Sequence, residues 1–148
     1  MPHIRKQIRS AAITALTGLA STGDNVHDVR GHAIGQGKLP ALIIRTPSEE
    51  SGYSNIGADP AIMRTISLTV LALAVGGASL ADDLDQIAVE CETALEADPT
   101  LGGICDDLLL IQTDFEPPDG DGETLSNAVL MTFQVETRTA RSDATVKV

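Results

Sequence analysis

The strongest constraint on the fold comes from two segments in which apolar and polar residues alternate. One face of residues 63–75 consists of Ile66, Leu68, Val70, Ala72 and Ala74. The corresponding face of residues 125–139 consists of Val129, Met131, Phe133 and Val135. Because successive side chains of a strand point to opposite faces, each pattern predicts a strand with one buried face. The chain must therefore build a sheet that hides one side.

Two other segments repeat with the period of a helix. The first covers residues 3–20 and is expected to end at Gly23; its apolar stripe is Ile4, Ile8, Ala12, Ala15, Leu16 and Leu19. The second opens at Ser79, which forms an S-x-x-D capping box with Asp82, and stops before Pro99. Its stripe is Leu80, Leu84, Ile87, Ala88, Cys91 and Leu95. Each helix thus has one face to bury.

The remaining segments predict short strands and loops. We expect strands over residues 26–29, 39–46 and 104–115, with Pro47 closing the second of them. Residues 47–62 show neither period and predict a long mobile loop, and residues 116–123 predict a shorter one. The glycines at 31, 35 and 37 indicate a flexible connection, and residues 140–148 a flexible C-terminal tail.

These elements predict an α+β fold. The order is one helix, two or three strands, a helix and two strands, which favours a mainly antiparallel sheet of four to five strands with two helices packed on one face. The chain of 148 residues fits one domain, residues 1–148, and we find no internal repeat or dividing linker. The second face of the sheet, lined by Thr, Ser, Gln and Glu, is left for water or a partner.

Charge is unevenly distributed. The formal net charge is −11, and no Lys or Arg occurs between Thr65 and Thr137, a stretch with fifteen carboxylates. Nucleic-acid binding requires clustered cations, so this segment disfavours it; a solvated acidic surface that maintains solubility is the simpler interpretation. No run of about 18 apolar residues predicts a membrane span, and no apolar segment at the N-terminus predicts a secretion signal.

Candidate chemical groups have simpler structural explanations. Ser79 lies in a G-x-S-x-A sequence between strand and helix, but all three histidines precede it, so we expect a capping serine rather than a nucleophile. The carboxylates at 119, 121 and 123 do not have the spacing of a calcium loop, and His27 and His32 lack further zinc ligands nearby. Cys91 and Cys105 are expected to be buried thiols rather than a disulfide or a metal site. We predict no catalytic residue, cofactor or metal.

The chain resembles the tail terminator proteins of long-tailed bacteriophages, the family of minor tail protein U. The resemblance covers residues 3–139 and consists of weak patterns rather than invariant residues. Its segments are I-R-K-Q-I-R-S-A-A-I-T-A-L at 4–16, L-P-A-L-I-I at 39–44, T-I-S-L-T-V at 65–70, S-L-A-D-D-L-D at 79–85 and D-P-T-L-G-G at 98–103.

This resemblance implies a structural, non-enzymatic virion protein at the junction of tail and neck, assembled in the host cytoplasm. Such a protein forms a homo-hexameric ring on the tail tube protein, stops tube polymerisation and meets the head completion or connector protein, while DNA passes through without specific binding. The residues expected at the subunit or tube interface are Arg45, Glu49, Glu50, Tyr53 and Arg64. The alternatives are another head-tail connector or completion subunit, a small enzyme and a ligand-binding module.

Overall fold

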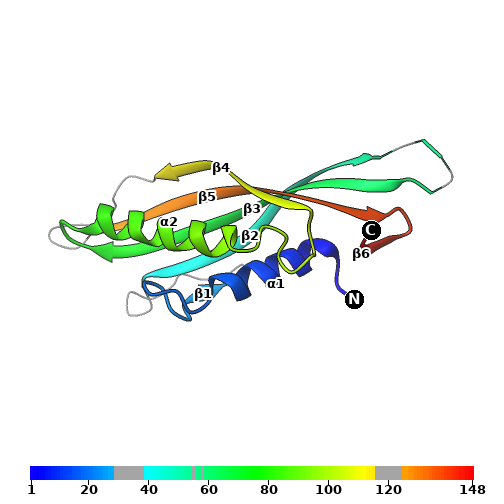
Figure 1. Ribbon diagram of the computed structural model, residues 1–148. Helices are drawn as coiled ribbons and strands as arrows, with labels where there is room; N and C mark the ends of the chain where they lie inside the picture. Colours follow the sequence, from blue (N-terminus) through cyan, green and yellow to red (C-terminus); the bar gives the residue numbers. More distant parts are fainter. Residues whose placement is uncertain (29–38, 55, 58, 116–124) are drawn as a thin grey trace.

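Over the residues that the structure describes, the fold consists of two helices and a sheet of six strands (Figure 1). The computed structural model describes residues 1–28, 39–54, 56–57, 59–115 and 125–148. The helices are α1 (Ile4–Leu16) and α2 (Leu80–Glu96). The strands are β1 (Val26–His27), β2 (Ala41–Tyr53), β3 (Ala61–Gly76), β4 (Asp107–Phe115), β5 (Leu125–Ala140) and β6 (Asp143–Lys147).

The strands form one mixed sheet in the order β1-β2-β3-β5-β4, with β6 pairing to the end of β5. β1 runs parallel to β2, and every other pair is antiparallel. The predicted α+β class is therefore confirmed. The predicted strand number was too low, because the short strand β6 in the supposed tail adds to the sheet, and the parallel β1–β2 pair makes the sheet mixed.

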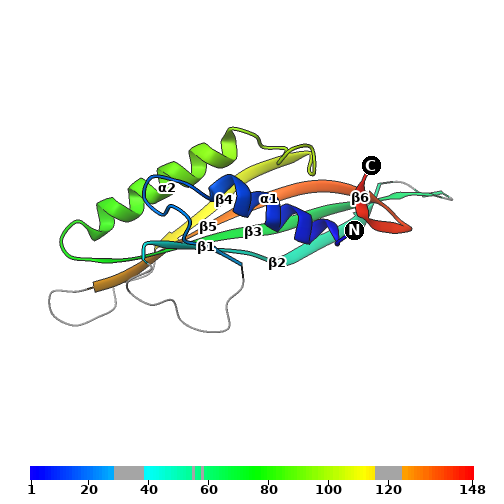
Figure 2. The same ribbon diagram turned by 90° about the horizontal axis from the view of Figure 1, so that it is seen from below.

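Both helices lie on the same side of the sheet (Figure 2). The stripe of α1 buries Ile4, Ile8, Ala12 and Leu16, and that of α2 buries Leu80, Leu84, Ile87, Cys91 and Leu95. These side chains form one hydrophobic core with the inward residues of β3 and β5. Burial of each large apolar side chain stabilises the fold by about 1.5–3 kcal/mol, so this layer supplies the main driving force.

The two central strands confirm the alternation seen in the sequence. Every inward position predicted for residues 63–75 and 125–139 is buried. β3 and β5 pair along sixteen residues, from Ala61 opposite Ala140 to Gly76 opposite Leu125. This register puts Leu68 opposite Phe133 and Val70 opposite Met131 on the helix-covered face.

Helix α1 ends earlier than predicted. His3 caps its first turn by accepting a hydrogen bond at Nδ1 from the Arg5 amide (3.1 Å), and Leu16 is its last residue. Thr17 is extended and Gly18 has a φ of 88°, a conformation that glycine adopts without strain, so the chain leaves the helix there rather than at Gly23.

The prediction of a long loop over residues 47–62 was wrong for residues 47–53 and 61–62, which belong to strands. β2 continues through Pro47 to Tyr53, and β3 begins at Ala61. An irregularity between Arg45 and Ser48 accommodates the proline, which has no N–H for the ladder. Beyond it the two strands pair from Ser48 opposite Ser67 to Tyr53 opposite Ile62, so backbone hydrogen bonds rather than an apolar face order this segment.

The predicted free tail at 140–148 was also wrong, because Asp143–Lys147 turns back as β6 beside β5. Gln7 fixes β6 to α1 by donating from Nε2 to the Thr145 carbonyl (2.6 Å). The glycines at 31, 35 and 37 and the loop predicted at 116–123 lie outside the described residues.

Helix α2 begins after Ser79, as predicted, but without the predicted capping box. The Ser79 side chain makes no capping hydrogen bond and instead donates to Asp83 Oδ2 (3.3 Å). Cys91 and Cys105 are buried free thiols, as expected. Neither described helix is suited in length and hydropathy to spanning a lipid bilayer.

Candidate interface site

The five residues predicted at an interface all lie on β2 or β3, and the structure divides them into two groups. Glu49 and Arg64 contact each other within the subunit. Arg45, Glu50 and Tyr53 are exposed. The second group is therefore available to a partner, whereas the first has an internal role.

Glu49 and Arg64 form a buried ion pair. Arg64 Nη1 donates to Glu49 Oε2 at 2.7 Å, and their side chains are 8% and 9% exposed respectively. Arg64 Nε also donates to Thr139 Oγ1 (3.0 Å), and Arg5 Nη1 donates to Glu49 Oε1 (3.0 Å). One network thus joins α1, β2, β3 and β5.

The environment of Glu49 keeps it ionised. Burial, the largest influence, raises the pKa of Glu49, but hydrogen bonds from Ser51, Arg64 and Arg5 and the charge of Arg64 together lower that pKa below its ordinary value. The charged form is therefore the one that the fold favours. It fixes the base of the β2–β3 hairpin relative to α1.

Beyond this network the hairpin extends past α1 as an arm, which we define as the described residues 50–54, 56–57 and 59–63 (Figures 1 and 2). Tyr53, Ile56 and Met63 are exposed apolar side chains on it. The Arg141 guanidinium lies 5.6 Å from the centre of the Tyr53 ring, a cation–π contact between the arm and the β5–β6 turn. The arm thus presents apolar groups on a supported strand pair.

The face of the sheet opposite the helices is mainly polar. On β3 it carries Thr65, Ser67 and Thr69, then Leu71 and Leu73. No helix among the described residues lies on this face (Figure 2).

Strand β4 forms the other notable surface, and the sequence analysis did not single it out. It pairs with β5 on one side, and no described strand pairs with its other side. Four large apolar side chains on it are exposed: Leu109, Leu110, Ile111 and Phe115. The sequence carries a signal for this surface, because residues 108–111 are all apolar and do not alternate with polar residues.

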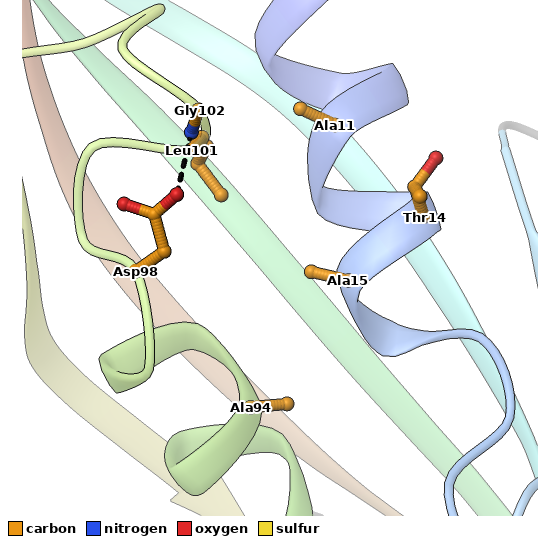
Figure 3. Close-up of a pocket in the computed structure, with 7 residues that line it drawn as sticks. All are labelled: Ala11, Thr14, Ala15, Ala94, Asp98, Leu101 and Gly102. Atoms are coloured by element: carbon orange, nitrogen blue, oxygen red, sulfur yellow. Dashed lines mark hydrogen bonds between the residues drawn. The ribbon is translucent and has the colours of Figure 1, made fainter.

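A shallow apolar hollow of about 300 Å³ lies between the two helices (Figure 3). Its walls are Ala11, Thr14 and Ala15 of α1 and Ala94, Asp98, Leu101 and Gly102 at the end of α2. A neighbouring hollow of about 360 Å³ shares Ala94 and extends to Val89 and Leu19. Small side chains, rather than groups suited to chemistry, create this space.

Among the described residues that line the first hollow, Asp98 is the one with an ionisable side chain, and its carboxylate is hydrogen-bonded within the turn after α2. Asp98 Oδ1 accepts from the Thr100 hydroxyl (2.6 Å) and amide (3.1 Å), and Oδ2 accepts from the Gly102 amide (2.7 Å). The hydrogen bond from the Thr100 hydroxyl is the main cause that lowers the pKa of Asp98. This carboxylate is a turn-forming group rather than a free acid or base.

The other chemical candidates are also engaged structurally. Ser79 donates to Asp83, as described above. Burial raises the pKa of the Cys91 and Cys105 thiols to about 12, which suppresses the reactive thiolate. Within the described residues, no three His, Cys, Asp or Glu side chains are grouped closely enough to bind a metal ion. His32 and the carboxylates at 119, 121 and 123 lie outside the described residues.

Comparison with known proteins gives little further information. No protein-family model and no curated protein matches the chain. Among solved structures it is similar to a chain from the "Virion of native gene transfer agent (GTA) particle", with 13% identity, a TM-score of 0.35, and coverage of 90% of this chain and 92% of that chain. A likeness this distant establishes neither fold nor function.

Proposed function

We propose that this protein is a structural, non-enzymatic subunit that forms a ring on the end of a phage tail tube. In that position it stops tube polymerisation and provides the surface that meets the head connector. The proposal begins from the resemblance to tail terminator proteins and is supported most directly by the arm, a preformed β-hairpin with exposed apolar side chains beyond the core.

The arm has the features of a protein-docking element. Aromatic residues and arginines are enriched where proteins bind each other, and the arm places Tyr53 next to Arg141. Ile56 and Met63 add apolar area nearby. Because the Glu49–Arg64 pair fixes its base, the arm loses little conformational freedom on docking, and we assign it to the tail tube protein.

The charge distribution suits a ring through which DNA passes. The segment from Thr65 to Thr137 has no Lys or Arg. A channel lined by its carboxylates repels the phosphate backbone, so DNA moves through without adhering. The proposed partners are thus other copies of this chain in a homo-hexamer, the tube protein and the head completion or connector protein, all at the tail-neck junction of a virion.

Tube polymerisation in vitro tests the proposal. Purified tube protein is allowed to grow with and without this chain, and tube length and ends are measured by electron microscopy. We expect shorter tubes that carry a ring at one end. Unchanged tube lengths and bare ends would rule out a terminator, and binding to the head connector alone would instead identify another neck subunit.

Variants of the arm test whether this segment makes the contact with the tube protein. Replacing Tyr53 and Ile56 together by serine removes exposed apolar groups and is expected to abolish arrest without reducing the stability of the subunit. Val146→Ser on β6 is the matched control, because Val146 is also an exposed apolar residue but lies off the arm. Equal effects of the two changes would contradict the assignment of the arm.

A further inference from the structure

We propose that neighbouring copies of this chain associate head to tail, with the open edge of β4 in one subunit meeting the β2 edge of the next. The inference deepens the proposed function, since it specifies the subunit contact of the ring. It also stands on observations of its own, namely the exposed apolar side chains and carboxylates of β4 and the exposed cation Arg45 on β2.

Two features that often prevent edge association are absent from the open side of β4. Exposed edge strands are normally protected by Lys or Pro, and the nine residues of β4 contain neither. Instead Ile111 is 55% exposed and Phe115 is 60% exposed. The ladder is irregular between Leu110 and Gln112, so Ile111 has no residue of β5 directly opposite it.

The β4 edge is acidic, and its carboxylates have no cationic partner among the described residues. Asp114 accepts hydrogen bonds only from Gln112 Nε2 (3.1 and 2.9 Å), and Asp107 accepts from the Leu108 amide (2.8 Å). Asp107 also lies directly opposite Glu136 on β5. Like charges placed opposite each other destabilise a strand pair, so a cation from outside would relieve this edge.

The opposite edge of the sheet is basic over residues 41–48 of β2, where Arg45 is the one charged residue, although Glu49 and Glu50 follow it towards the arm. β1 pairs with β2 only at Leu42 and Ile43, so no described strand pairs with the outer side of β2 beyond them. Arg45 is exposed there, and Arg9 of α1 donates to Thr46 Oγ1 (3.0 Å), which brings the basic face of α1 to this edge. Among the described residues neither Arg45 nor Lys6 has an ion-pair partner.

The negative charge of β4 therefore favours the β2 edge of a second copy, rather than its β4 edge, as the partner strand. Pairing β4 with the β4 of a second copy would bring two acidic strands together, which is unfavourable. Pairing it with the β2 edge of a second copy instead brings an acidic strand, which carries Asp114, towards Arg45. Because the two surfaces lie on opposite edges of one sheet, the contact is heterologous, and repeated contacts of this kind close into a ring when the rotation permits.

Cross-linking tests this arrangement. Gln112→Cys on β4 and Ser48→Cys on β2 place single exposed thiols on the two edges, whereas Cys91 and Cys105 are buried with pKa values raised to about 12 and remain unreactive. A short bismaleimide should link the mixture of the two variants but neither variant alone. Thr93→Cys, exposed on α2 between the two edges, is the control and should give no link with Ser48→Cys.

Charge reversal provides a second, independent test of the proposed contact. Asp114→Lys is expected to lower the yield of the mixed cross-link about tenfold, and Arg45→Glu in the partner is expected to restore it. Cross-linking of Gln112→Cys with itself would overturn the proposal in favour of a two-fold β4 contact. Failure of Arg45→Glu to restore the yield would overturn it as well.

Running the reaction with and without tube protein separates this inference from the proposed function. Mixed cross-links in protein that does not arrest tubes would refute the terminator function and leave the contact established. Arrested tubes whose rings show no mixed cross-link would refute the contact and leave the function. Absence of the mixed cross-link under both conditions overturns the inference.

Discussion

Replacing Glu49 by glutamine should destabilise the subunit by about 3 kcal/mol. The change leaves Arg64, only 8% exposed, without its carboxylate at 2.7 Å, and removal of one member of a buried pair costs about 3–5 kcal/mol. We expect the destabilisation to be at the lower end of this range because Glu49 lies on a strand with an open side. The second ion pair adds little, since Arg5 is 43% exposed and solvent screens it.

Urea unfolding at pH 7 of the wild type, Glu49→Gln and Glu50→Gln measures this effect. Glu50 is the neighbouring residue on the same strand and is exposed, so its replacement should change the free energy of unfolding by less than about 0.5 kcal/mol. Similar free energies of unfolding for the two variants would show that the Glu49–Arg64 pair does not stabilise the subunit. A double mutant with Arg64→Met then isolates the coupling between the two side chains.

The difference between wild type and Glu49→Gln should also depend on pH. The pKa of Glu49 is lower in the folded subunit than its ordinary value of 4.5, so the unfolded chain binds the proton more readily. The stabilisation is complete above pH 4.5 and is lost as pH falls through the lower folded pKa. A gap that stays constant down to acidic pH would contradict the ionic origin of the effect.

Three further outcomes are expected. Phe133→Ala removes a fully packed ring that is 2% exposed and should lower the free energy of unfolding by about 3–5 kcal/mol, measured by urea titration. Gly102→Ala forces a side chain into a backbone with φ of 75° and should cost about 1 kcal/mol or more in the same assay. Cys91 and Cys105 should react with a thiol reagent at the rate of unfolding, and rapid reaction of the native protein would contradict their burial.

The sequence correctly predicted the parts of the fold in which buried positions recur with a regular spacing along the chain. The alternation of residues 63–75 and 125–139 identified the inward faces of the two central strands correctly. In α2, five of the six predicted stripe residues are buried, and Ala88 is partly buried against the same core. Such patterns can be recognised because strands and helices have different periods and because both kinds of element bury their apolar side chains.

The arm and β6 were missed for the converse reason. From Ser48 to Tyr53 nearly every side chain of β2 is exposed, so no apolar period marks the strand. Its order comes from backbone pairing with residues 62–67 across the hairpin, which a local pattern does not encode. Pro47 suggested an end, but an irregularity in the ladder accommodates it.

The predicted interface residues likewise show what a local pattern can and cannot indicate. The sequence placed five polar and aromatic residues in one region, and three of them are exposed there. It gave no sign that Glu49 and Arg64, fifteen positions apart, would be buried against each other. Nor did it indicate that β4 would lie at an edge, because strand order depends on which segments pair across the whole chain.

The amino-acid sequence by itself determined which residues avoid water, where positive charge is missing and how helix and strand alternate, since each of these depends on neighbours along the chain. Only the tertiary structure decided which strand is left at the edge, which ions are buried together and which apolar groups remain exposed. Those properties depend on contacts between distant segments, and a surface is defined by what the rest of the fold does not cover.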